Sequence, residues 1–161
     1  MISHEDISAF RRKLANDLAG PICYRTGKPW ASPSFIDNYI AALPDKRIYE
    51  HLEHVRKHRD FGNFPELDYK DIITENLISE ADVEEYIKRL ADEMRKIVWD
   101  EDEPIPETRI AGHHYHMNGE RFYGEEKIRQ ECSTVDKYTL LGGDLFGDTP
   151  EEHAHSDYVC Y

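Results

Sequence analysis

The stretch "HHYHMNGERFY", residues 113–123, decides the fold prediction for this chain of 161 residues. Asn118-Gly119 stands at its centre, between residues that alternate in character. Asn-Gly is the strongest short signal for a two-residue β-hairpin, because a type I′ turn needs a positive φ at both central residues. This turn predicts an antiparallel hairpin with three facing pairs: His116 with Arg121, Tyr115 with Phe122, and His114 with Tyr123.

The residues before this hairpin show helical periodicity instead. Ser3 with Asp6, and Ser79 with Asp82, each resemble a capping box that begins a helix. A further helix is expected to begin at Ser32-Pro33, and another at Asp45. Residues 66–78 fit either a helix or a short buried strand, and we favour the helix.

These patterns together predict a single α+β domain over residues 1–161, with about four helices followed by a small antiparallel sheet. Residues 1–98 are expected to be mainly helical, and residues 99–107, "WDEDEPIPE", an acidic linker. Residues 108–161 are expected to be mainly β, with a further strand or two around Gly142-Gly143 and then a tail.

Charge is distributed unevenly along the chain. Residues 1–63 hold ten basic and eight acidic side chains, net +2, whereas residues 64–161 hold ten and twenty-five, net −15. An acidic surface repels nucleic acid and favours basic proteins, metal ions or sites that normally accept nucleic acid. Solubility alone is the simpler explanation of the same charge.

No segment indicates export or membrane insertion. No apolar run approaches the roughly 20 residues of a membrane span. The first residues, "MISHEDISAF", do not read as a signal peptide. Three widely spaced cysteines, Cys23, Cys132 and Cys160, fit a reducing compartment. We therefore expect a cytoplasmic protein without a membrane partner.

The histidines are the obvious candidate metal ligands in this sequence. His114 and His116 would share one face of a strand, and His153 and His155 could approach them. The spacing lacks the second half of a zinc motif, and cross-strand pairing explains the same residues without metal. We predict no metal and no cofactor, and we keep a His-liganded metal enzyme as an alternative.

A second histidine group lies on the expected third helix. His51, His54 and His58 recur at spacings of three and four. We interpret them as a flank that touches the core, and a pH-sensitive contact is the alternative. No GxSxG, Walker loop, GxGxxG or Cys/His nucleophile pattern is present, so no catalytic residue is assigned.

The C-terminal stretch "EEHAHSDYVCY" ends in aromatic and apolar residues directly after acids and histidines. Tyrosine and arginine carry much of the binding energy at interfaces. We expect an exposed anchor for a partner, and packing of Tyr158 and Tyr161 onto the core is the alternative. The candidate partner-binding residues are Tyr158, Val159, Tyr161, His155, Tyr115, Arg121 and Tyr123.

Residues 155–161, "HSDYVCY", are similar to the C-terminal degron of the bacterial SOS cell-division inhibitor, which the Lon ATP-dependent protease reads. That degron also has His-Ser, a polar residue, and then an apolar residue and a tyrosine near its end. His155-Ser156 match it, whereas Tyr161 is displaced by one position. In size, acidity and tail the chain resembles the Lon inhibitors that T-even phages encode.

This resemblance implies a non-enzymatic inhibitor of a host enzyme in the host cytosol. The implied partner is a hexameric ATP-dependent protease, bound outside its peptidase site so that ATP-driven substrate handling is impaired. The first alternative is an acidic nucleic-acid mimic that blocks a DNA-binding host enzyme and itself binds no nucleic acid. The second is the metal enzyme named above. The sequence leaves a homodimer open.

Overall fold

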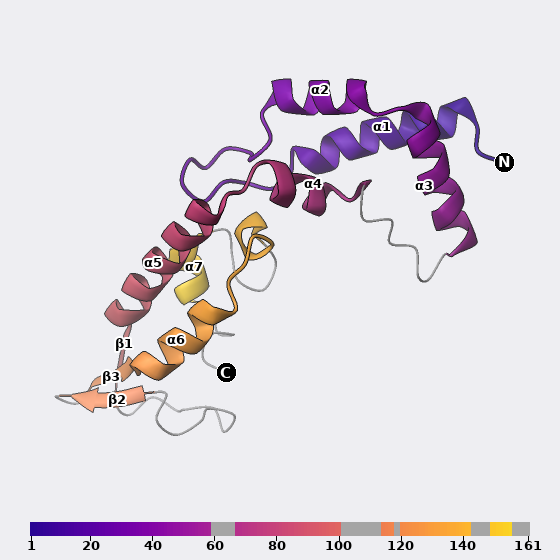
Figure 1. Cartoon of the computed structure of the whole chain (residues 1–161). Coiled ribbons are helices and arrows are strands. Elements are labelled where there is room, and N and C mark those ends of the chain that lie inside the picture. The colour runs from indigo at the N-terminus through magenta and orange to yellow at the C-terminus, as the bar shows by residue number, and fades with distance from the viewer. Residues whose placement is uncertain (59–66, 101–113, 118–119, 143–148, 156–161) are drawn as a thin grey trace. The chain divides into compact units, whose positions relative to one another are not determined.

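The structure is a computed structural model that describes residues 1–58, 67–100, 114–117, 120–142 and 149–155 (Figure 1). It is mainly helical, and the predicted α+β class is wrong. Seven α-helices occur in the described part of the chain: α1 (His4–Leu18), α2 (Pro33–Ala42), α3 (Asp45–Lys57), α4 (Tyr69–Asn76), α5 (Glu80–Lys96), α6 (Glu125–Ser133) and α7 (Pro150–Ala154).

The strands are too short to make a layer of the fold. They are β1 (Val98–Asp100), β2 (His114–Met117) and β3 (Glu120–Tyr123), in the order β1-β3-β2 with both pairings antiparallel. The Cα register of β2 and β3 places Tyr115 opposite Phe122 and His116 opposite Arg121. β1 includes Trp99 and Asp100, two residues of the expected linker, whose other residues lie outside the described part.

The mainly β character predicted for residues 108–161 is the origin of the wrong fold class. Gly124 is the N-cap of α6, whose first turn carries Glu125 and Glu126, and carboxylates favour a helix N-terminus. Where a strand was expected there is a 3₁₀ helix, η2 (Thr139–Leu141), which ends at Gly142. Gly142 has a φ of 79°, which a strand does not adopt.

In residues 1–98 the observed N-termini of the helices agree better with those predicted from the sequence. Both capping boxes form: the side chains of Ser3 and Ser79 accept from the backbone N–H of Asp6 and Asp82, and the serine backbone N–H groups donate to the aspartate carboxylates. Ser32 caps α2 with Pro33 in its first turn. The expected cap of α3 is wrong by one residue, since Pro44 is the N-cap. The helix favoured within residues 66–78 is confirmed as α4.

The chain forms two compact units, which we describe separately. Unit 1 comprises Met1–Cys23 and Gly27–Ile78. In it α1 contacts α2, α3 and α4. Arg11 on α1 donates to the carbonyl oxygens of Ile40 and Leu43, at 2.6 and 2.7 Å, and thereby satisfies the last turn of α2. The largest fully buried side chains of unit 1 are Leu18, Ile48 and Ile73.

Unit 2 comprises Tyr24–Thr26 and Ser79–Tyr161. α5 is its central helix and contacts α6, α7 and β3. The buried stripe of α5 includes Val83, Tyr86, Leu90 and Met94. This stripe brings helices that lie far apart in the sequence onto one core.

Candidate functional site

A buried chain of polar side chains joins the three helices of unit 2. Tyr86 Oη on α5 lies 2.9 Å from His153 Nδ1 on α7. His153 Nε2 lies 3.0 Å from Glu131 Oε1 on α6. Lys127 Nζ, one turn earlier on α6, lies 3.8 Å from Glu131 Oε2. We call these four residues the Tyr86–Lys127 chain.

With a neutral His153 side chain, the Glu131 carboxylate sets the direction of the hydrogen bonds among these residues. A carboxylate only accepts, so His153 Nε2 carries the proton that is donated to Glu131. In the neutral imidazole Nδ1 then accepts from the Tyr86 hydroxyl. Burial raises the pKa of Tyr86 well above its ordinary value, and the Glu151 and Glu131 carboxylates raise it further. Tyr86 therefore remains a neutral donor.

The order hydroxyl, imidazole, carboxylate is also the order of a catalytic relay, but the exposure of these groups excludes that role here. Tyr86 and His153 each expose only 1% of their surface. A nucleophile or general base must reach a substrate. The chain of bonds instead holds α7 against α5 and α6, because breaking it would leave buried polar groups without partners.

A second group of contacts holds α7 from the side. Arg89 of α5 donates to both carboxylate oxygens of Glu151, at 2.8 Å each. Burial acts to raise the pKa of Glu151, but the hydrogen bonds from Arg89 and the backbone, together with the charges of Arg89 and Lys96, outweigh it and the pKa is lowered. Arg89 also lies 5.2 Å from the centre of the Tyr24 ring, and Arg25 lies 5.5 Å from the same ring. Two cations thus contact one aromatic ring.

The predicted partner-binding residues fall into three groups. Tyr158, Val159 and Tyr161 lie outside the described residues. His155 is exposed, and its Nε2 lies 2.9 Å from Glu93 Oε1. Tyr115, Arg121 and Tyr123 lie on β2 and β3, where the backbone pairs Tyr123 with His114 and Arg121 with both His116 and Trp99.

The predicted metal alternative is not supported for His153. Both of its ring nitrogens already face Tyr86 and Glu131, so no lone pair is left for a metal. His113 lies outside the described residues. Within the described part of the chain, no group of three or more His, Cys, Asp or Glu side chains could hold a metal ion.

The histidines of α3 are partly covered, as the sequence predicted. His51 and His54 are half-buried and His58 is exposed. The His51 ring lies 4.9 Å from that of Phe10, and the rings of His54 and His58 lie 4.7 Å apart. Burial lowers the pKa of His51, and neighbouring His54 and Lys13 add to that effect. His51 therefore packs as a neutral ring against α1.

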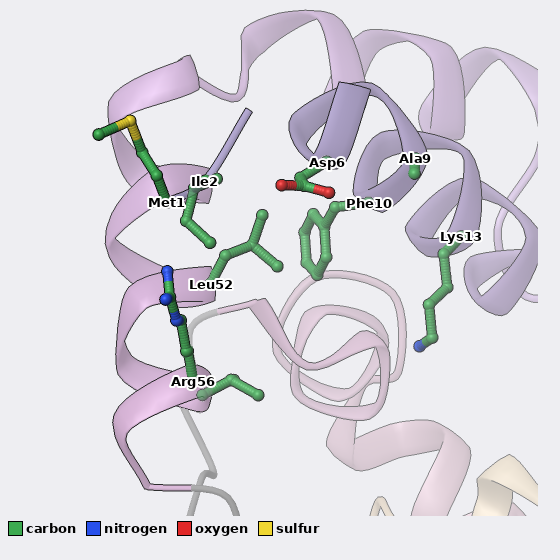
Figure 2. Close-up of a pocket in the computed structure, with 9 residues that line it drawn as sticks. Met1, Ile2, Asp6, Ala9, Phe10, Lys13, Leu52 and Arg56 are labelled. Carbon is green, nitrogen blue, oxygen red and sulfur yellow. The ribbon is translucent and has the colours of Figure 1, made fainter. Parts of the chain in front are cut away.

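Unit 1 contains an open groove between α1 and α3 (Figure 2). Its volume is about 600 Å³. Figure 2 shows Phe10 of α1 and Leu52 of α3 pointing toward one another across it. Nine residues line this α1–α3 groove: Met1, Ile2, Asp6, Ala9, Phe10, Lys13, Leu52, Val55 and Arg56.

No short-range pattern in the sequence connects Tyr86, Glu131 and Lys127. The missed signal was Thr149-Pro150-Glu151-Glu152, in which a capping threonine precedes a proline at the first helical position. In the structure Thr149 accepts from the backbone of Glu152, which begins α7. A helix predicted over residues 150–154 would have indicated that His153 lies on its buried face.

Comparisons with protein families, curated proteins and solved structures find no match to this chain. In the described part of the chain, no helix is both long and apolar enough to cross a membrane.

Proposed function

We propose that this chain is an acidic binding protein that inhibits a host enzyme, with a Lon-type ATP-dependent protease as its target. The observation that carries the proposal is the position of the degron-like sequence. Residues 155–161 directly follow α7, and α7 is held by the buried His153 and by the Arg89–Glu151 pair. A recognition sequence that begins at a fixed point loses less conformational entropy on binding than one on a loose tether.

The charge of unit 2 supports binding to a basic or cationic partner surface. Unit 2 holds ten basic and twenty-one acidic side chains, net −11, whereas unit 1 holds ten and twelve, net −2. Opposite charge accelerates encounter between proteins more than it strengthens the final complex. The acidic unit would therefore guide association, and the aromatic tail would supply most of the affinity.

We expect inhibition because residues 155–161 resemble a degron that Lon reads. The protease would engage the chain by its tail. The folded unit directly before the tail would resist unfolding, so the chain would occupy the protease without being degraded easily. Tail engagement also leaves the peptidase site free. We therefore expect inhibition of protein degradation with little effect on the cleavage of short peptides.

The test measures two activities of purified Lon in the presence of the full chain. ATP-dependent degradation of casein should be inhibited, and cleavage of a short fluorogenic peptide should not. Deleting residues 156–161 should weaken inhibition at least about tenfold, which corresponds to ~1.4 kcal/mol of binding free energy. The melting temperature should stay unchanged, because the anchors of α7 precede the deletion.

The control replaces Tyr49, an exposed tyrosine of unit 1, by alanine, and it should leave inhibition unaltered. A fall in melting temperature with unchanged inhibition would show that the tail belongs to the core and would refute its role. Absence of inhibition by the full chain would refute the protease as target. The acidic nucleic-acid mimic, which the −11 charge of unit 2 also supports, predicts instead competition with DNA for a DNA-binding enzyme.

A further inference from the structure

Two histidines lie together at the C-terminal end of α3 in unit 1. His54 and His58 are one helical turn apart, at positions i and i+4, which places them on one face of the helix. The backbone N–H of His58 donates to the carbonyl oxygen of His54 at 3.0 Å. Their ring centres lie 4.7 Å apart, with the ring planes tilted by 40°. The last turn of α3 therefore holds these residues, the His54–His58 pair, beside each other.

The distance between the two rings agrees with chelation of one metal ion. Imidazole nitrogens bind Zn²⁺ at about 2.0–2.1 Å, so two imidazoles on one ion, at an angle of roughly 90–110°, bring their ring centres to about 4.5–5 Å. The observed 4.7 Å lies within this range. A ligating histidine uses one ring nitrogen and donates its other N–H to a neighbouring group, so further contacts of either ring are compatible with metal binding.

An open depression beside the pair gives an ion and its water ligands room. Its volume is about 470 Å³, and it is lined by Tyr49, Glu50, Glu53, His54, Lys57 and His58. Its two carboxylates and one ammonium group give a net charge of −1. The C-terminal end of a helix also carries a partial negative charge. Both effects favour a cation at the end of α3.

The protein supplies two ligands at this position, and water supplies the others. Glu50, one turn before His54, is already paired: its carboxylate oxygens lie 3.3 Å from Arg47 Nη1 and 4.0 Å from Lys46 Nζ. Among the residues that the structure describes, no third His, Cys, Asp or Glu completes a larger group of ligands. Imidazole suits Cu²⁺, Ni²⁺ and Zn²⁺, whereas Mg²⁺ and Ca²⁺ prefer oxygen ligands.

From this arrangement we propose that the His54–His58 pair binds one divalent transition-metal ion, of the class of Cu²⁺, Ni²⁺ and Zn²⁺, through one ring nitrogen of each histidine. The ion links two side chains that are one turn apart and so stabilises the last turn of α3. The site lies in unit 1 and is separate from the tail on which the proposed function rests.

The test titrates the full chain with Zn²⁺ and follows the histidine ring resonances by NMR, which separates this site from the other histidines. The resonances of His54 and His58 should shift together and give one dissociation constant. Mg²⁺ at the same concentrations should leave both unchanged, because it prefers oxygen ligands. Hydrogen exchange of the amides in the last turn of α3 should slow when Zn²⁺ is bound.

Replacing either histidine tests the chelate. His54→Gln should weaken Zn²⁺ binding at the His58 ring at least about tenfold, which corresponds to ~1.4 kcal/mol, and His58→Gln should do the same at the His54 ring. His4→Gln, at an exposed histidine of α1 that does not line the depression, is the matched control and should change neither ring's response. Circular dichroism checks that each variant retains its helical content.

A fourth variant tests the electrostatics of the site. Lys57→Gln removes the ammonium group that lines the depression. It should strengthen Zn²⁺ binding by roughly twofold to fivefold, because exposed charges interact by about 0.2–1 kcal/mol. Unchanged affinity in this variant would contradict the placement of the ion in the depression.

Three further results would overturn the proposal. The first is the absence of Zn²⁺-dependent shifts at His54 and His58, which would mean that the two rings only pack against each other. The second is unchanged affinity at one ring after replacement of the other histidine, which would show separate binding rather than a chelate. The third is loss of the shifts in His4→Gln, which would place the ion at the N-terminal end of α1. None of these results bears on protease inhibition.

Discussion

At the scale of single residues, Tyr86 has two roles that the sequence does not separate. Its ring belongs to the apolar stripe of α5 and lies at a right angle to the Tyr24 ring, with ring centres 5.3 Å apart. Its hydroxyl donates to His153 and so connects α5 to α7. A phenylalanine would keep the first role and lose the second, which makes the hydroxyl separately testable.

Replacing Tyr86 by phenylalanine should reduce the free energy of unfolding by about 1–3 kcal/mol, because the buried hydrogen bond between its hydroxyl and His153 Nδ1 would be lost. Urea unfolding measures the change. Tyr49→Phe, at a tyrosine that is 41% exposed, is the matched control and should cost much less. Equal losses in the two variants would mean that the hydroxyl of Tyr86 does not stabilise unit 2.

The same variant should also change the alkaline pH dependence of stability. The pKa of Tyr86 is raised in the folded chain, so above about pH 10 the unfolded chain loses this proton while the folded chain keeps it. The contribution of Tyr86 to the free energy of unfolding is therefore fully present below about pH 10 and is lost as pH rises further. Tyr86→Phe should show a shallower fall between pH 10 and 11 than the wild type. An unchanged slope would contradict the raised pKa.

At the scale of elements, α7 shows how a helix of five residues is maintained. So short a helix is not stable alone, since nucleation costs more than its few hydrogen bonds return. Thr149 caps its start with a bond of 3.1 Å to the Glu152 backbone. His153 and Ala154 bury its inner face at 1% and 0% exposure. Cap and burial together set the point from which the tail begins.

Replacing Thr149 by alanine should lower the free energy of unfolding by about 1 kcal/mol, as is typical for loss of an N-cap. Thermal unfolding measures this loss, and hydrogen exchange of the α7 amides should accelerate. Thr149→Ser retains the hydroxyl and serves as the control, with near wild-type stability. If serine and alanine were equally destabilising, the lost methyl group rather than the cap would be responsible.

At the scale of the whole molecule, charge divides the chain more sharply than secondary structure does. Both units are helical in their cores, yet their net charges are −2 and −11. Exposed carboxylates of unit 2 include Glu84 on α5 and Glu126 on α6. Like charges in one unit produce a field that extends over about a Debye length, roughly 8 Å at physiological ionic strength.

Association with the proposed protease should therefore slow steeply as salt rises from low concentration to about 0.15 M, because ions screen the long-range attraction. Stopped-flow or surface-binding kinetics measure the association rate. Glu84→Gln with Glu126→Gln should reduce the slope, whereas Glu75→Gln on α4 of unit 1 should not. A rate that is flat across this range would show that charge does not guide the encounter.

The sequence by itself determined the helices of the first half and the division of charge. Capping residues such as Ser3 and Ser79 act through bonds to residues three positions away, so short-range sequence is sufficient to predict them. The prediction that residues 108–161 are mainly β was wrong. It extended the Asn118-Gly119 hairpin signal to residues that instead form α6, with Gly124 as its N-cap, and α7, with Thr149 as its N-cap. The Thr149 cap is equally local and could have been recognised, whereas Gly124 caps α6 without a side-chain hydrogen bond.

Only the tertiary structure decided the polar contacts on which α7 depends. Tyr86 and His153 are 67 positions apart, and His153 and Glu131 are 22 apart. The residue types show that each of these side chains can form hydrogen bonds, but they do not show which partner it bonds to. The packing of α5, α6 and α7 excludes water from these groups, and a buried polar group must then bond to whatever the fold brings within reach. Pairing over such separations is a property of the core, which no local pattern contains.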